Sequence, residues 1–284
     1  MSAVIQLFSN PRSGSYKAER LHALARAFES LGATVIESES GHTPPVIRDG
    51  VTHVCVAAGD GTVRHVAGAV ARAGHPVAFS IFPAGTVNLL AMEAAYPTDP
   101  MQFAQRVLAS EPRRKHYPAT LGDGYFFACA GVGPDSLTVA NVSLGLKRRI
   151  GRLAYAAAFL GLLWKWPRHR ITLTCDERVL DCEAFYVAKG RYYAGRWSFA
   201  PQARLNEPLL HVVALTSAGR RDYVRFVWAL LRGHDPAVLP DVTVLSCTRL
   251  RATSDAALPI QADGDVVGTL PVAIAMCETP LAFC

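Results

Sequence analysis

The first 112 residues alternate short apolar runs with amphipathic segments, and this alternation restricts the possible folds more than any other feature. The apolar runs are short enough for buried strands, and the segments between them carry apolar residues at helical spacing. Strands that alternate with helices pair in parallel and are covered on both faces. We therefore expect an α/β domain with a parallel sheet and helices on both faces. The predicted strands are 3–8, 33–38, 53–58 and 76–85, and the main predicted helices are 16–31 and 63–74.

The pattern changes after residue 112. Short strand-like runs bounded by turns follow one another to about residue 269, which is typical of a mostly β domain. Two helical stretches, about 144–166 and 221–233, interrupt them. The sequence thus predicts an α/β domain over 1–116 and a β-rich domain over 117–269.

Charge and cysteine content restrict the partners and the compartment. The net charge of +6 favours an anionic partner, which leaves nucleotide phosphates, an acidic membrane surface and nucleic acid as alternatives. The seven cysteines are scattered and form no C-x-x-C pair, so we expect a reduced cytoplasmic protein without disulfides or a zinc site. No apolar stretch is long enough to span a bilayer, and the first residues are expected to form a strand rather than a signal peptide.

Three loops of the α/β domain share one chemical logic. NPRSGS (10–15), GDGT (59–62) and PAGTVN (83–88) each follow a predicted strand. In a parallel sheet these loops lie at one edge, where glycine allows close approach to a phosphate and helix N-termini offer unpaired N–H groups. Lys17, Arg64 and His65 can add positive charge, although Arg64 and His65 also suit a solvated helix face. The candidate nucleotide-binding residues are Asn10, Pro11, Arg12, Ser13, Gly14, Gly59, Asp60, Gly61, Thr62, Gly85, Thr86 and Asn88.

Asp60 is unusual in such a loop because a carboxylate beside phosphates is unfavourable unless a cation lies between them. One interpretation is that Asp60 binds Mg²⁺, directly or through water. The other is that Asp60 caps a helix that begins near Val63. The two interpretations are compatible.

Six segments in order along the chain resemble the diacylglycerol kinase family, which includes bacterial lipid kinases and the sphingosine and ceramide kinases. It is more distantly similar to NAD kinases and phosphofructokinases. The segments are NPRSG, AAGDGT, PAGTVNLLA, FACAGVGPDS, APQARLNEPLLHVVAL and QADGD. The resemblance implies a two-domain lipid kinase that binds ATP and Mg²⁺ in a cleft between the domains, with residues 270–284 returning to the first domain.

The resemblance also implies a catalytic residue. The family has a proposed general base in an Asp-Gly-Glu motif, and Asp265 takes the place of that glutamate, so the catalytic candidates are Asp265 and Asp60. The alternative for Asp263-Gly264-Asp265 is a simple hairpin turn, since Asp-Gly favours one. The alternatives for the whole chain are an NAD-kinase-like enzyme and a non-catalytic homologue that binds lipid or nucleotide.

The sequence departs from the family pattern at two acidic positions. Leu89 stands where the family often has aspartate after asparagine. Residues 206–211 read Asn-Glu-Pro-Leu-Leu-His, whereas some bacterial diacylglycerol kinases have an Asp-Gly-x-x-Asp segment that holds a structural Mg²⁺. We expect that structural metal to be absent here, and this difference favours a ceramide or sphingoid acceptor slightly over diacylglycerol.

Residues 143–170 form the most unusual stretch of the sequence. It has a basic start, a long apolar body and a Trp-Lys-Trp end, which suits a membrane interface or the mouth of a lipid pocket. The alternative is a core helix with a charged rim. We expect a cytoplasmic protein that associates peripherally with the anionic inner face of the membrane, with a membrane lipid as substrate and no nucleic-acid partner. The candidate lipid and membrane contacts are Arg148, Arg149, Tyr155, Phe159, Leu163, Trp164 and Trp166.

Overall fold

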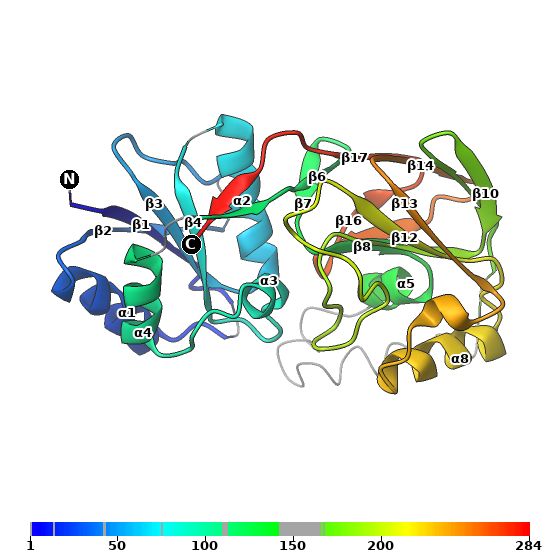
Figure 1. Cartoon of the computed structure of the whole chain (residues 1–284), viewed down its shortest axis with the longest axis horizontal. Helices are drawn as coiled ribbons and strands as arrows, with labels where there is room; N and C mark the ends of the chain where they lie inside the picture. Colours follow the sequence, from blue (N-terminus) through cyan, green and yellow to red (C-terminus); the bar gives the residue numbers. More distant parts are fainter. Residues whose placement is uncertain are drawn as a thin grey trace. The chain divides into compact units, whose positions relative to one another are not determined.

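The computed structural model describes residues 2–13, 15–41, 44–74, 76–109, 113–141, 166 and 168–284. It divides the chain into two compact units (Figure 1). Unit 1 comprises the chain up to Pro118 together with Glu278–Cys284, and unit 2 comprises Ala119–Cys277. The return to unit 1 therefore begins after residue 277, later than the predicted residue 270.

Unit 1 is a six-stranded sheet in the order β2-β1-β3-β4-β18-β5. Strands β1 to β4 are parallel, and β18 is parallel to β4 and antiparallel to β5. The chain runs from β1 to β2 in one direction along the sheet and from β3 to β4 in the other. Right-handed crossovers then place α1 and α2 on opposite faces (Figure 1). The elements are β1 (Val4–Ser9), α1 (Ala18–Ser30), β2 (Thr34–Glu39), β3 (His53–Ala58), α2 (Asp60–Ala73), β4 (Ala78–Pro83), α3 (Leu89–Glu93), α4 (Pro100–Leu108), β5 (Arg114–His116) and β18 (Leu281–Phe283).

The buried residues of unit 1 follow the strand and helix periodicities of its sequence. All six residues of β3 are buried, as expected for a central strand with helices on both faces. Helix α1 buries Leu21, Leu24 and Phe28 on one stripe, and α2 ends where Gly74 adopts a left-handed conformation. The buried ring of Phe103 on α4 packs edge-on against Phe28, which joins α4 to α1.

Unit 2 contains two further six-stranded sheets, in the orders β10-β9-β14-β17-β6-β7 and β13-β12-β11-β8-β15-β16. Figure 1 shows α5 and α8 beside these sheets. The elements are β6 (Ala119–Leu121), β7 (Gly124–Phe126), β8 (Cys129–Val132), α5 (Pro134–Asn141), β9 (Ile171–Cys175), β10 (Arg178–Cys182), β11 (Ala184–Ala188), β12 (Leu210–Leu215), α8 (Arg220–Leu231), the 3₁₀ helix η1 (Pro236–Val238), β13 (Val242–Cys247), β14 (Arg249–Ser254), β15 (Pro259–Ala262), β16 (Asp265–Thr269) and β17 (Val272–Met276).

Alternation along the strands of unit 2 separates the core from the outer faces. On β11, Phe185 and Val187 belong to the apolar core that both sheets share. Tyr186, which points to the other face, stacks on Phe226 of α8 with the ring centroids 5.5 Å apart. Helix α8 therefore covers the outer face of the second sheet, which explains why every residue of β11 is buried.

The structure confirms the α/β and β-rich fold class and corrects some elements. Strand β10 was not predicted, since its residues are mostly exposed and carry little alternation. Strand β17 pairs with β14 and β6 and so belongs to unit 2. The predicted helix 144–166 lies outside the described residues except for Trp166. In the part of the chain that the structure describes, no helix is both long and apolar enough to cross a bilayer.

Candidate functional site

The loops after β1, β3 and β4 lie at one edge of the sheet of unit 1. The three strands are neighbours and run in the same direction, so their carboxyl ends coincide, as predicted. The first two loops are also joined directly, because the Asn10 side-chain amide donates to Thr62 Oγ1 at 3.2 Å. The sheet thus brings two predicted nucleotide-binding side chains into contact across 52 residues of sequence.

Backbone contact joins the second loop to the third. A Cβ atom added to Gly85 would lie 2.4 Å from the Cα of Gly59 and 2.7 Å from Asn88 Oδ1. Real Cβ atoms essentially never approach other heavy atoms so closely. Gly85 therefore has a packing role, since only glycine lets the two loops touch.

Asp60, in the second loop, holds the third loop in place through hydrogen bonds. Its Oδ2 accepts from the amide of Asn88 at 3.0 Å and its Oδ1 accepts from the amide of Leu89 at 2.8 Å. Helix α2 begins at Asp60 and has Gly59 as its N-cap, so the alternative that Asp60 caps a helix starting near Val63 is wrong. Asp60 instead lies in the first turn of α2, where its charge complements the helix dipole.

Asn88 fixes the shape of the third loop. It adopts a left-handed conformation with φ of 59°. Its side chain makes two bonds to one residue: Gly85 N donates to Asn88 Oδ1 at 2.6 Å, and Asn88 Nδ2 donates to Gly85 O at 2.9 Å. Asparagine suits this position because it tolerates positive φ and bonds to the nearby backbone.

The remaining predicted residues of unit 1 line the same edge less deeply. Pro11, Arg12 and Thr86 are exposed, and Ser13 Oγ lies 3.0 Å from Ser15 Oγ. Gly61 is half-buried in the first turn of α2, and Gly14 lies outside the described residues. A small hollow of about 20 Å³ lies against this edge, and Asn10, Ser13, Lys17 and Ala58 are among its lining residues.

In unit 2, Asp263 and Gly264 form the turn of a two-residue hairpin between β15 and β16. Both have positive φ, 48° and 89°, as a type I′ turn requires. The structure therefore confirms the hairpin interpretation of the Asp-Gly-Asp segment. Asp265 is the first residue of β16 and is half-buried, and its role as a general base stays a prediction.

The carboxylate of Asp263 is buried and organises the strand beside it. It accepts from the backbone amides of Phe127 at 2.9 Å, Ala128 at 2.9 Å and Cys129 at 3.0 Å. These amides lead into β8, so Asp263 fixes the hairpin to the start of that strand. Nothing in the Asp-Gly spacing predicts this contact.

Asp135 is a half-buried acid of the FACAGVGPDS segment that was not among the predicted site residues. Its Oδ2 accepts from Tyr193 Oη at 3.0 Å and from Gln261 Nε2 at 3.4 Å, while its buried Oδ1 has no partner among the described residues. Burial raises the pKa of Asp135 to about 6, against the lowering effect of hydrogen bonds from the Ser136 amide and Tyr193. The signal that would have found it is an acid placed directly after a Gly-x-Gly-Pro turn.

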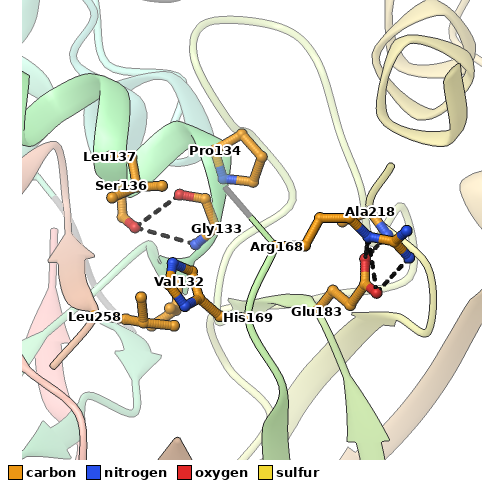
Figure 2. A pocket seen from close by; sticks show the side chains of 10 residues that line it. All are labelled: Val132, Gly133, Pro134, Ser136, Leu137, Arg168, His169, Glu183, Ala218 and Leu258. Atoms are coloured by element: carbon orange, nitrogen blue, oxygen red, sulfur yellow. Dashed lines mark hydrogen bonds and ion pairs between the residues drawn. The ribbon is translucent and has the colours of Figure 1, made fainter. Parts of the chain in front are cut away.

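A shallow pocket lies at the start of α5 (Figure 2). It is lined by Gly133, Ser136 and His169, among others, and by the paired side chains of Arg168 and Glu183. Its volume is only about 10 Å³, which is no more than about one water molecule requires. This pocket is therefore too small to hold a lipid.

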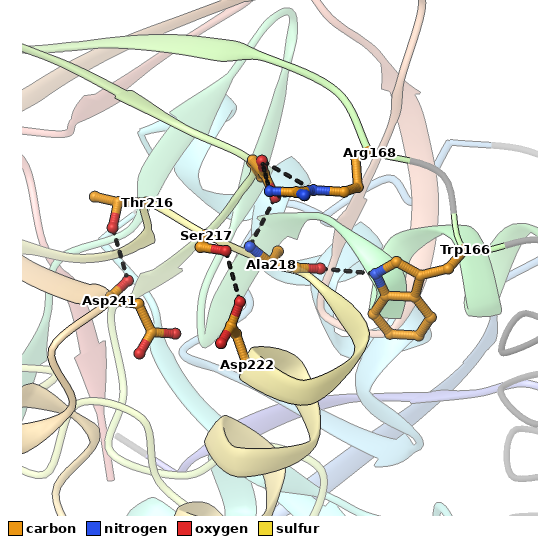
Figure 3. A network of polar contacts seen from close by, with 8 residues as sticks. Trp166, Arg168, Thr216, Ser217, Ala218, Asp222 and Asp241 are labelled. Carbon is orange, nitrogen blue, oxygen red and sulfur yellow. Dashed lines mark hydrogen bonds and ion pairs between the residues drawn. The ribbon is translucent and has the colours of Figure 1, made fainter.

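Of the predicted lipid contacts, only Trp166 lies among the described residues; the other six fall outside them. Figure 3 shows Trp166 at the N-terminal end of α8, where its indole N–H donates to the Ala218 carbonyl at 2.7 Å. The ring also packs on Tyr223 with centroids 5.4 Å apart. The half-buried Trp166 thus anchors α8, and its membrane contact stays a prediction.

The site and the fold together define a class of protein. It joins an α/β unit, whose three glycine-containing loops meet at one sheet edge, to a β-sandwich unit. Comparison with known proteins identifies the family within that class. Residues 4–117 match the diacylglycerol kinase catalytic domain, and residues 128–283 match the YegS C-terminal NAD kinase beta sandwich-like domain. The chain belongs to this diacylglycerol kinase and YegS-like family.

Individual relatives agree with this assignment. A Pseudomonas putida protein named "Probable lipid kinase YegS-like" is 30% identical over 171 residues, which cover 58% of this chain and 56% of that protein. A Pseudomonas aeruginosa protein of the same name is 31% identical over 180 residues, covering 62% of this chain and 57% of that protein. These matches span less than two thirds of either relative.

The solved structures agree on the fold. The crystal structure of a diacylglycerol kinase from Bacillus anthracis superposes with a TM-score of 0.76 and 17% identity, covering 99% of this chain and 96% of that one. At this identity the similarity speaks for the fold alone.

Proposed function

We propose that the protein is an ATP-dependent lipid kinase that transfers the γ-phosphate to a hydroxyl of a membrane lipid alcohol. The observation that carries the proposal is the joined edge of unit 1, where Asn10, Thr62, Asp60 and Gly85 tie three loops together. Phosphoryl transfer depends on positioning and charge neutralisation more than on covalent chemistry. A rigid edge of amides at the N-terminus of α2 suits the binding of a polyphosphate.

Mg²⁺ fits this edge as a partner of the nucleotide rather than as a resident ion. Among the described residues, no group of three or more His, Cys, Asp or Glu side chains could hold a metal by itself. Mg²⁺ is commonly held by one or two carboxylates together with substrate phosphates. Asp60 would supply the carboxylate, since a carboxylate that accepts two amides retains lone pairs for a cation. The ion would neutralise phosphate charge.

Asp265 is proposed as the general base that takes the proton from the lipid hydroxyl. Its place at the start of β16 is fixed by the buried turn that precedes it. For the acceptor, we favour a ceramide or sphingoid lipid slightly over diacylglycerol. Leu89 and the nearly acid-free segment 206–211 support this preference, because both lack acids found in the family.

The outward face of α8 supports peripheral association with an anionic membrane. Val224, Trp228 and Leu231 recur at helical spacing and are 52%, 60% and 47% exposed. The exposed Arg221 and Arg232 flank this apolar face, and the Arg232 guanidinium lies 5.8 Å from the Trp228 ring. Exposed apolar residues beside arginine suit the boundary between headgroups and acyl chains. The cytoplasmic face is proposed because all seven cysteines are free thiols.

A panel of acceptors tests the function. The purified protein is incubated with labelled ATP, Mg²⁺ and, separately, ceramide, sphingosine, diacylglycerol or NAD. A labelled lipid supports the proposal and identifies the acceptor, whereas labelled NADP or no transfer to any acceptor contradicts it. Transfer that is unchanged by Asp60→Ala or Asp265→Ala would remove the roles proposed for these two residues.

Vesicle binding tests the membrane surface separately. We expect Val224→Ser and Trp228→Ser to reduce co-sedimentation with anionic vesicles several-fold, and zwitterionic vesicles to bind weakly. Val179→Ser is the matched control, because Val179 on β10 is 66% exposed but lies on another element. Equal loss from the control and the α8 variants would show that the α8 face has no special role.

A further inference from the structure

Lys189 is the only lysine among the largest fully buried side chains of the described residues, and it lies directly after β11. Its Nζ donates to three backbone carbonyls: Arg204 O at 2.9 Å, Leu205 O at 3.3 Å and Glu207 O at 2.6 Å. An ammonium group has three N–H donors, so these carbonyls match its bonding capacity. A buried charge is costly unless its bonds are satisfied in this way.

The three carbonyls surround the ammonium much as carbonyl oxygens surround a bound metal ion. They belong to one turn, 204–207, just before β12. Lys189 lies at the other end of the same connection, since residues 189–209 join β11 to β12. The ammonium therefore closes the base of a 21-residue loop.

A divalent cation does not fit this turn. The carbonyl oxygens that would coordinate it already accept from Lys189, and the ammonium repels a second cation nearby. The acid of the turn, Glu207, has an exposed side chain. Four residues later, where a second carboxylate would be needed, stands His211, whose Nδ1 lies 3.2 Å from Ser246 Oγ.

The surroundings of His211 are consistent with a resident positive charge. It is buried, and its Nε2 has no hydrogen-bond partner among the described residues. Burial lowers the pKa of His211, and the charges of Lys189 and Arg204 lower it further, against the opposing effect of Glu207. A neutral imidazole beside the turn is consistent with an ammonium as its resident cation.

We propose that the Lys189 ammonium takes the place of the structural divalent cation that the resemblance to some bacterial diacylglycerol kinases implies for this segment. Unit 2 then folds and keeps its 204–207 turn without metal. Lys189 is a positioning residue, because the loop that it closes carries Tyr193, the donor to Asp135. The proposal concerns the stability of unit 2 and does not depend on kinase activity.

Thermal unfolding tests the proposal on the full chain without nucleotide. We expect the wild-type melting temperature to be the same, within about 1 °C, in Mg²⁺, in Ca²⁺ and in EDTA. Lys189→Met keeps a similar length but removes the charge and the donors, so it lowers the melting temperature by roughly 5 °C or more in all three solutions. The control is Lys115→Met at an exposed position on β5, which leaves the melting temperature unchanged.

A second variant tests whether a cation site can be created when the ammonium is removed. In the triple variant Lys189→Met, Glu207→Asp and His211→Asp, two carboxylates replace the ammonium beside the same carbonyls. We expect this protein to be stabilised by Mg²⁺ or Ca²⁺ and destabilised by EDTA. The proposal is overturned if the wild type is stabilised by either ion, or if Lys189→Met is as stable as the wild type. If Lys189→Met does not fold, the proposal is still tested by the metal dependence of the wild-type melting temperature and by the triple variant.

Discussion

The buried carboxylate of Asp263 gives the sharpest test of how unit 2 is held together. Asp263→Asn keeps the shape of the side chain but replaces one acceptor oxygen by an NH₂ donor. With the amide oxygen in the place of Oδ1, the bonds from Ala128 and Cys129 remain, and the Phe127 amide faces a donor. A buried unsatisfied amide costs about 1–3 kcal/mol, and the two remaining bonds lose their charge assistance. Removal of the buried charge offsets part of this cost, so we expect Asp263→Asn to lower the free energy of unfolding by about 3 kcal/mol.

Asp265→Asn is the matched control, because it makes the same chemical change two residues later at a half-buried position. We expect it to change the free energy of unfolding by less than about 0.5 kcal/mol. If Asp265 is the general base, the same variant reduces kcat by roughly 100-fold or more. Urea unfolding followed by circular dichroism measures the first quantity and labelled-ATP transfer measures the second. An Asp263→Asn protein as stable as the wild type would refute the reasoning about the turn.

Two further predictions concern the loops of unit 1 and the half-buried acid Asp135. Gly85→Ala is expected to weaken ATP binding, measured by calorimetry, at least about tenfold, because its Cβ would overlap Gly59 and Asn88. The control is Gly268→Ala on β16, where an added Cβ meets nothing within 4 Å. Since the pKa of Asp135 is raised to about 6, its folded form binds the proton more tightly than the unfolded chain does. The resulting stabilisation, about 3 kcal/mol, is fully present below about pH 4 and is lost as the pH rises through 6. Asp135→Asn should remove this part of the pH dependence in urea unfolding between pH 4 and 8, and an unchanged slope would contradict the assignment.

The sequence was sufficient for the parts of the fold that depend on local patterns. The apolar run 53–58 has the length of a buried parallel strand, and it forms β3 with every residue buried. Gly74 ends α2 in the left-handed conformation that glycine permits. The edge where three loops meet was also predictable, because it follows from parallel pairing alone.

The partners of the polar side chains were not predictable in the same way. Asp60 bonds to amides 28 and 29 residues away, Asp263 bonds to amides more than 130 residues away, and Lys189 bonds to carbonyls up to 18 residues away. None of these contacts has a periodicity or a spacing that local sequence can reveal. They follow from the topology, which places one loop beside another only after the sheets have formed.

Asp60 and Asp263 show why the acids of the two glycine motifs are difficult to assign from activity alone. Each residue precedes a glycine, and each carboxylate accepts hydrogen bonds from backbone amides of a neighbouring loop or strand. Replacing either residue would break the hydrogen bonds from those amides, whether or not the carboxylate also binds a metal or a substrate. A loss of activity in Asp60→Ala therefore does not by itself assign Mg²⁺ binding. The discriminating measurement is the dependence of activity on Mg²⁺ concentration in Asp60→Asn, which retains one acceptor for the amides of Asn88 and Leu89. A metal-binding role raises the Mg²⁺ requirement, whereas a purely positioning role lowers the rate equally at every Mg²⁺ concentration.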